Sequence, residues 1–76
     1  MSLLNGKNND SQDPLTRNMQ NEVIKIASER LGYPLPANLV AKVRQPNWSY
    51  MGLEMMIESV REIEKSEILT YLSKLD

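Results

Sequence analysis

Apolar residues recur at helical spacing along the chain, and they are densest between residues 47 and 75. When residues are placed at about 100° each, the first part of this stretch forms one apolar stripe with charged residues beside and behind it. The stripe consists of Leu53, Met56, Ile57, Val60 and Ile63. The pattern predicts an amphipathic helix from Trp48 to Lys65. No segment alternates apolar and polar residues as a strand does, so we expect an all-α fold.

The stripe changes direction after Lys65. The next apolar residues centre about a quarter turn away from it, and they are Ile68, Leu72 and Leu75. One straight helix cannot direct both halves toward the same neighbour. We therefore expect a long C-terminal helix that is bent or broken near Lys65-Ser66. Either a bent continuation or a fourth helix would then run from Ser66 to Leu75, with Ser66 able to serve as an N-cap.

An earlier helix is marked at both ends. Asp13 suits an N-cap, and Pro14 suits the first helical position, where its missing N–H is not needed. Gly32 suits the position just after a helix, because a left-handed conformation costs glycine nothing. These signals predict a helix from Pro14 to Leu31, whose apolar face comprises Leu15, Met19, Val23, Ile26, Ala27 and Leu31.

Two prolines delimit a short second helix. Pro36 can open it and Pro46 stops it, so we expect it to run from Pro36 to Gln45. Asn47 is then the expected N-cap of the next helix. Gly52, inside that helix, is explained either by the close approach of another backbone or by an N-terminal turn that tolerates glycine. The pattern as a whole predicts a small three- to four-helix bundle.

A chain of 76 residues has room for one domain. Residues 1–13 are rich in Asn, Ser and Asp and lack periodicity, so we expect a flexible N-terminal tail followed by a single helical domain over residues 14–76. The chain contains no cysteine and no histidine, which excludes disulfides, ordinary zinc sites and histidine-based catalysis. We expect a cytoplasmic protein with no cofactor, no bound metal and no membrane-spanning segment.

The net charge is −1, so bulk electrostatics favours neither nucleic acid nor a membrane surface as a partner. The distribution is uneven, however, because residues 47–76 carry six acidic and three basic residues. Three of the acidic residues fall near one helix face at four-residue spacing, namely Glu54, Glu58 and Glu62. We expect a solvated face without the desolvated pocket that a catalytic carboxylate needs, and hence no enzymatic activity. Such a face would instead suit a basic partner.

The leading functional hypothesis is a protein-interaction module, either a homodimer or a small adaptor or regulator. Its contact surface is predicted from apolar residues outside the main stripe and from the tryptophan near the helix start, namely Met51, Met55, Leu69, Leu72 and Trp48. Methionine occurs both in cores and in binding surfaces, so a core role for Met51 and Met55 stays open. For Trp48 the alternatives are a core plug and a binding anchor.

The alternative hypothesis is a DNA-binding transcriptional regulator. Residues 23–45 resemble a loose helix-turn-helix, with a proline-stiffened turn after Gly32. The residues that would contact base edges or phosphates are Arg30, Asn38, Lys42 and Arg44. The turn is longer than the usual motif requires, and an ordinary helical hairpin with a solvated basic face explains the same pattern.

Overall fold

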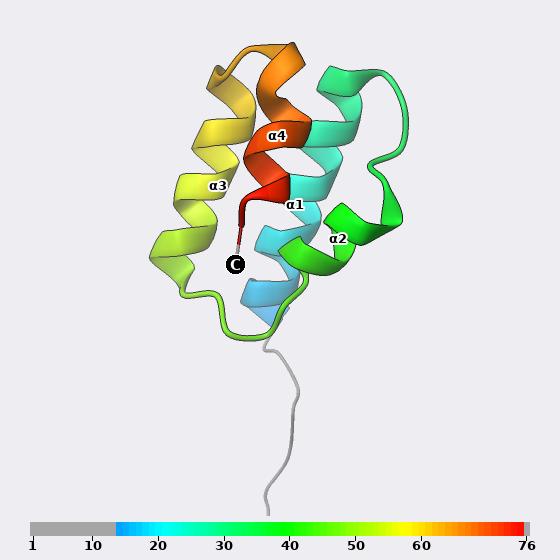
Figure 1. Cartoon of the computed structure of the whole chain (residues 1–76). Helices are drawn as coiled ribbons and strands as arrows, with labels where there is room; N and C mark the ends of the chain where they lie inside the picture. Colours follow the sequence, from blue (N-terminus) through cyan, green and yellow to red (C-terminus); the bar gives the residue numbers. More distant parts are fainter. Residues whose placement is uncertain (1–13, 76) are drawn as a thin grey trace, which may run out of the picture.

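Four α-helices make up most of the computed structural model, which describes residues 14–75 (Figure 1). They are α1 (Pro14–Leu31), α2 (Ala37–Val43), α3 (Tyr50–Glu62) and α4 (Ile68–Ser73), and a short 3-10 turn, η2 (Lys65–Glu67), leads into α4. The described residues contain no strand, which confirms the predicted all-α fold. The predicted tail over residues 1–13 and the N-cap at Asp13 lie outside the described residues.

Local chemistry sets both ends of α1. Its first residue is Pro14, whose missing N–H costs nothing where the amide has no partner within the helix. Gly32 follows the last residue with a φ of 86°, and its N–H donates to the Ser28 carbonyl at 2.9 Å. L side chains rarely adopt this left-handed conformation, so glycine is favoured here. The predicted bounds of this helix are confirmed.

The third helix starts later than expected, and its N-cap is Ser49 rather than Asn47. The Ser49 hydroxyl accepts a hydrogen bond from the Gly52 N–H at 3.0 Å, which satisfies one of the amides left free at a helix start. A Cβ at Gly52 would meet the Ser49 Oγ at 3.2 Å, and no backbone of another described element lies within 4 Å. Gly52 is therefore explained by its place in an N-terminal helical turn that tolerates glycine, and not by the close approach of another backbone.

The expected bent continuation of one long C-terminal helix is wrong, whereas the alternative, a separate fourth helix, is confirmed by α4. α3 ends at Glu62, and the next residues, Ile63 and Glu64, are extended with ψ of 164° and 142°. The chain thereby reverses, and α4 runs back along the bundle opposite to α3 (Figure 1). Ser66 lies inside η2 and is not an N-cap. Because the break resets the helical phase, the apolar residues after it cannot be placed by extending the periodicity of α3.

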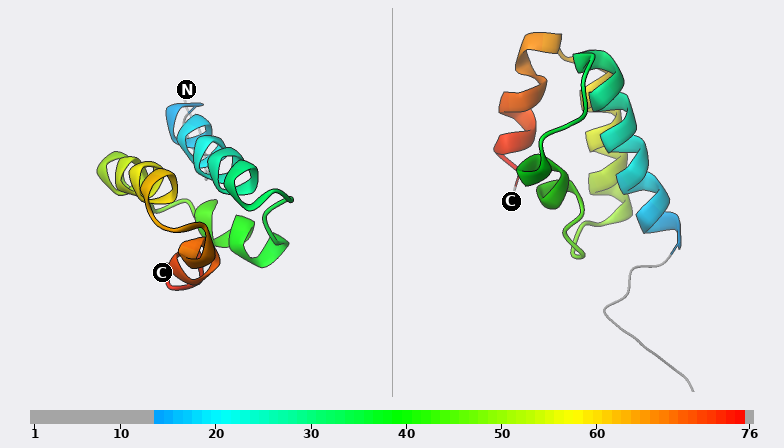
Figure 2. Two further views of the ribbon diagram at one scale, coloured as in Figure 1. Left: turned by 90° about the horizontal axis from the view of Figure 1, so that it is seen from above. Right: turned by 90° about the vertical axis from the view of Figure 1, so that its right-hand side faces the viewer.

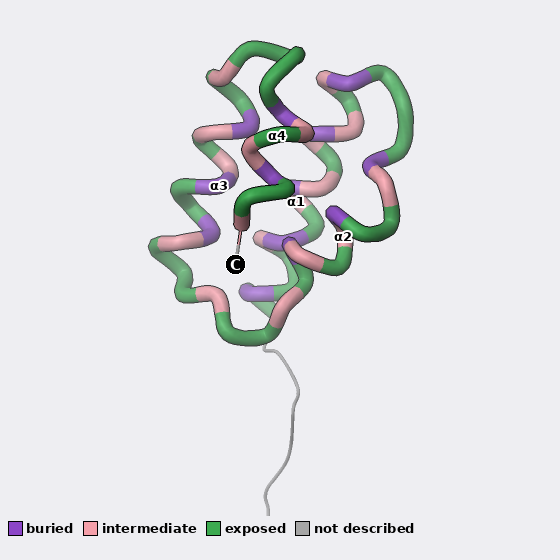
Figure 3. Tube along the Cα trace, in the orientation of Figure 1, coloured by how far each residue is buried: buried purple, intermediate pink, exposed green. Residues whose placement is uncertain are grey.

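The helices form two pairs. α1 and α3 lie side by side and run in the same direction, and α1 packs most extensively against α3 (Figure 1, Figure 2). α2 lies crosswise and packs mainly against α4. Buried segments of all four helices face the interior of the bundle (Figure 3). The apolar core comprises Val23, Ala27, Leu31, Leu35, Leu39, Val43, Leu53, Met56, Val60, Ile68 and Leu72.

The buried face of α1 is rotated at its N-terminal end relative to the predicted apolar face. Thr16 and Gln20 are buried there, whereas Leu15 is 52% exposed. The Gln20 Nε2 donates to the Gln45 carbonyl at 3.0 Å and so ties α1 to the segment after α2. This hydrogen bond offsets part of the cost of burying the polar side chain, whose Oε1 has no hydrogen-bond partner among the described residues. The expected inward orientation of Leu15 is therefore wrong.

Candidate protein-binding surface

The residues predicted to form one contact surface lie in separate parts of the fold. They are Met51 and Met55 in α3, Trp48 in the connector before it, and Leu69 and Leu72 in α4. Leu72 is fully buried, because α4 folds back after the chain reversal and directs this side chain into the core. Its assignment to a contact surface is therefore wrong.

Trp48 is partly buried and stabilises the connector between α2 and α3. Its indole N–H donates to the Lys42 carbonyl at 3.0 Å, and its ring packs against the core. A large aromatic side chain whose polar atom is satisfied within the chain contributes mainly to the fold. Of the two alternatives for this residue, the contacts favour the core plug.

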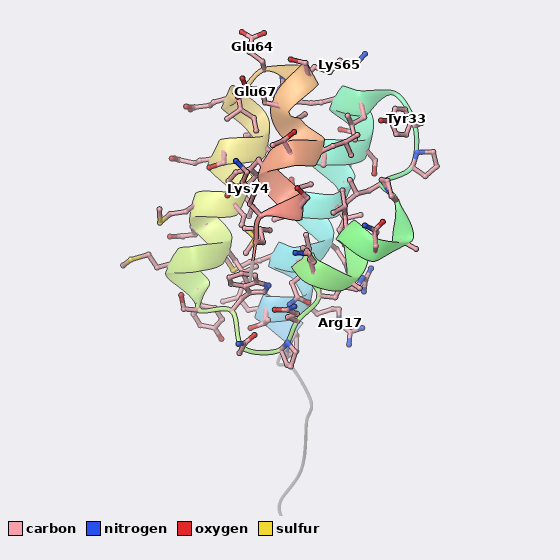
Figure 4. All side chains as sticks on the ribbon, viewed as in Figure 1. Arg17, Tyr33, Glu64, Lys65, Glu67 and Lys74 are labelled. Carbon is pink, nitrogen blue, oxygen red and sulfur yellow. The ribbon has the colours of Figure 1, made fainter. Side chains whose placement is uncertain are left out.

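Leu69 is partly buried and lines a pocket of about 460 Å³. The other lining residues are Leu31, Tyr33, Glu64, Lys65 and Ser66. Figure 4 shows Tyr33, Glu64 and Lys65 at the end of the bundle where the chain passes from α3 to α4. This pocket shares no residue with the exposed side of α3, so Leu69 does not belong to one surface with Met51 and Met55.

The side of α3 that points away from the core carries the most exposed large apolar side chains of the described residues. Met51 is 71% exposed and Met55 is 63% exposed. Sulfur-bearing side chains project from α3 away from the other helices (Figure 4). Residues four positions apart lie on adjoining turns of one helix face. We call this surface the outer face of α3 and define it as Met51, Glu54, Met55, Glu58 and Glu62.

Two further exposed apolar side chains lie near the same end of the α1–α3 pair. Leu15 is in the first turn of α1, and Tyr50 is the first residue of α3. Because the two helices run in the same direction, their first turns lie at one end of the bundle (Figure 1). Of the five exposed large apolar residues within residues 14–75, four therefore lie in the first two turns of α1 or α3, namely Leu15, Tyr50, Met51 and Met55.

Two grooves accompany the outer face of α3. One lies between α3 and α1 and is lined by Met19, Glu54, Ile57 and Glu58. The other lies on the far side of Glu58 from the first groove. Its lining residues are Met55, Glu58, Ser59, Glu62 and Ile63. Each groove combines apolar side chains with two carboxylates, and Glu58 lines both.

The carboxylates of the outer face carry an unbalanced negative charge. The ion pair that involves α3 in the described chain joins Arg61 to Glu22 at 4.0 Å, and both side chains are largely exposed, so it contributes little. Glu54, Glu58 and Glu62 form no ion pair within residues 14–75. Carboxylates four residues apart on a helix repel each other by about 0.2–0.5 kcal/mol per pair. A cation brought to this face would relieve that repulsion.

Arg30, one of the residues of the DNA-binding alternative, is engaged within the fold. From the last turn of α1, its Nη1 donates to the Val60 carbonyl at 3.0 Å and to the Ile63 carbonyl. Because α1 and α3 run in the same direction, their negative C-terminal ends lie close together, and a cation between them is favourable. The guanidinium therefore stabilises the helix pair.

Lys42 has the same kind of contact in the other helix pair. Its Nζ donates to the Ser73 carbonyl, at the C-terminal end of α4, at 2.8 Å, and to the Leu75 carbonyl, two residues after the helix ends, at 2.9 Å. Asn38 and Arg44 are exposed. Two of the four residues predicted to contact DNA thus donate to backbone carbonyls within the fold, and the DNA-binding alternative stays a prediction.

Sequence reasoning missed the contribution of α1 to this surface. Met19 lines a groove and Leu15 is exposed, although both were expected on the buried face. The available signal was the spacing of the true buried stripe, which runs through Thr16, Gln20, Val23, Ala27 and Leu31. Thr16 and Gln20 are polar, so a pattern based on apolar residues passes over them.

Other kinds of site find no support in the described part of the chain. Residues 14–75 contain no group of three or more side chains placed to hold a metal ion. Nor does that range contain a helix long and apolar enough to cross a bilayer. Comparison of the whole chain with protein families, curated proteins and solved structures finds no match.

Proposed function

We propose that the chain is a protein-interaction module, without catalytic activity of its own, that binds another protein through the outer face of α3. The observation that carries this proposal is the exposure of Met51 and Met55, at 71% and 63%, on the side of α3 away from the core. These side chains add little burial energy to the fold, whereas a partner that covers them removes apolar surface from water. The two neighbouring grooves support the proposal because they would receive partner side chains.

A different protein suits this face better than a second copy of the chain. In a symmetric dimer the same patch meets itself, so Glu54, Glu58 and Glu62 of both copies would come together. Arg61 is the single basic residue of α3 and cannot balance three glutamates. Juxtaposed like charges oppose association. The proposed role is therefore that of a small adaptor or regulator rather than a homodimer.

The test is site-specific photo-crosslinking followed by reconstitution. A photoreactive amino acid is placed at Met51 of the full chain and, in a matched control, at Asn21, which is exposed on α1. We expect a discrete adduct from position 51 and none from position 21. The crosslinked protein is identified, purified and titrated with wild type and with the Met51→Ala/Met55→Ala variant, for which we expect affinity to fall at least about tenfold.

Two results would contradict the proposal. Equal crosslinking from positions 51 and 21 would show that contact is not directed to the outer face of α3. Unchanged affinity of the purified partner for the double methionine variant would show that the methionines are not the contact. An adduct between two copies of the chain, accompanied by a dimer in sedimentation, would replace the adaptor role with self-association.

A further inference from the structure

The spacing of side chains on the outer face of α3 limits the shape of a partner segment. Met51 and Met55 are about 6 Å apart along the helix axis, and the face from Met51 to Glu62 extends about 16 Å. Side chains of a second helix recur at the same spacing. Rows of its side chains can therefore pack between those of α3 and into the two flanking grooves. About three helical turns of a partner would cover the face.

The charges of the same face limit the chemistry of that segment. Glu54, Glu58 and Glu62 repeat every four residues, and each groove presents two of these carboxylates beside apolar side chains. Apolar partner residues would contact Met51 and Met55, while cations at four-residue spacing would meet the carboxylates. Charge complementarity of this kind determines partner choice and register more than raw affinity.

From these two observations we infer that the partner presents a basic amphipathic helix, which lies along α3 with its apolar residues on the methionines and its Lys or Arg side chains on the glutamates. The inference rests on the proposed function and adds the class of partner. Three turns of helix form a small interface, so the complex is of micromolar affinity and weakens as salt screens the charges. The same face of a second copy does not supply such a helix, because it carries the same three glutamates.

The experiment titrates the full chain with synthetic helical peptides of about 18 residues, long enough to hold helix in isolation. The basic probe has leucines on one face flanked by Lys and Arg. The acidic probe keeps the leucines and replaces each cation by Glu. Binding is measured by anisotropy at low and moderate salt, and the contact is mapped from amide chemical shifts. We expect shifts centred on α3 with the basic probe and at least about tenfold weaker binding of the acidic probe.

Matched variants distinguish the effect of charge on the outer face of α3 from the effect of the net charge of the chain. Glu58→Gln/Glu62→Gln removes two negative charges from the outer face of α3, and we expect the basic probe to bind about fivefold to tenfold more weakly. Asn21→Lys/Asn38→Lys changes the net charge equally at exposed positions of α1 and α2, and we expect affinity within about twofold of wild type. Met51→Ala/Met55→Ala should also weaken binding about fivefold or more.

Several outcomes would overturn the inference. These are equal binding of the two probes, shifts centred away from α3, an equal loss of affinity in the Asn21→Lys/Asn38→Lys control, and no effect of the methionine variant. Such failures are distinguishable from failure of the proposed function. If the reconstituted partner still depends on Met51 and Met55 but offers a neutral or acidic surface, the partner class is wrong and the interaction module stands.

Discussion

The α1–α3 pair and the α2–α4 pair are held by the same kind of contact but differ in length and in what they expose. In each pair a cation from the last turn of one helix donates to the terminal carbonyls of the other, Arg30 to α3 and Lys42 to α4. The first pair contains helices of 18 and 13 residues, and the second contains helices of 7 and 6 residues. The long pair alone presents exposed methionines.

The difference shows how a small chain can leave one helix face uncovered. Isolated helices shorter than about 12–15 residues are marginal in water, so α2 and α4 depend on burial of their apolar side chains. Those side chains enter the common core, namely Leu39, Val43, Ile68 and Leu72. The longer helices bury several residues each, so α3 can keep Met51 and Met55 outside. This comparison predicts unequal effects of substitutions in the two pairs.

The largest effect is expected for Leu72→Ala in the short pair. The side chain is fully buried, so its truncation leaves a cavity and should lower the free energy of unfolding by about 2–5 kcal/mol. Urea denaturation followed by circular dichroism measures this loss. The exposed neighbour Thr70 provides the control, since Thr70→Ala should change stability by less than about 0.5 kcal/mol. Equal stability of the two variants would contradict the packing of α4 in the core.

A smaller loss is expected for Arg30→Met, which keeps most of the aliphatic stem and removes both hydrogen bonds to α3. Hydrogen bonds from a charged group to partly buried carbonyls are worth more than ordinary ones, so unfolding should become easier by about 1–3 kcal/mol. The same denaturation experiment applies. Lys25→Met, exposed on α1, should have little effect. If the two variants behave alike, the cation does not hold the helix pair together.

Lys42→Met should cost less than Arg30→Met, about 0.5–1.5 kcal/mol, because one of its two hydrogen bonds is exposed to solvent. Amide hydrogen exchange should show the loss as faster opening of α4 relative to α3. Lys74→Met, on the exposed side of the same region, serves as control. Faster exchange spread evenly over all helices would mean that Lys42 does not act on α4 specifically.

The parts of the fold that were predictable from sequence are those with local signals. Pro14 and Gly32 mark the ends of α1, and the stripe around Val60 shows the buried side of α3. The change in direction of the apolar stripe predicted a break near Lys65-Ser66, but no glycine or proline marks its actual place at Ile63 and Glu64. Tertiary packing sets this reversal, and the burial of Leu72 follows from it.

In the candidate site, too, some residues were predictable from local signals and others were not. Met51 and Met55 could be located from α3 alone, because their place on the helix wheel is opposite the stripe. Arg30 and Lys42 could not, since their partner carbonyls are about 30 residues distant in sequence. A basic residue in the last turn of a helix indicates a favourable interaction with a C-terminus. It does not indicate that the C-terminus belongs to another helix.

The smallest effect on stability is expected for Met51→Ala/Met55→Ala. An unchanged stability would show that the long helix pair, unlike the short one, carries apolar side chains that the fold does not need. Both side chains are exposed, so the free energy of unfolding should change by less than about 0.5 kcal/mol. Met56 is adjacent in sequence and only 2% exposed, so Met56→Ala should cost about 2–5 kcal/mol in the same urea titration. A loss above about 1 kcal/mol for the double variant would mean that the methionines contribute to the fold. Retained stability together with lost partner binding would separate the binding face of α3 from its buried face.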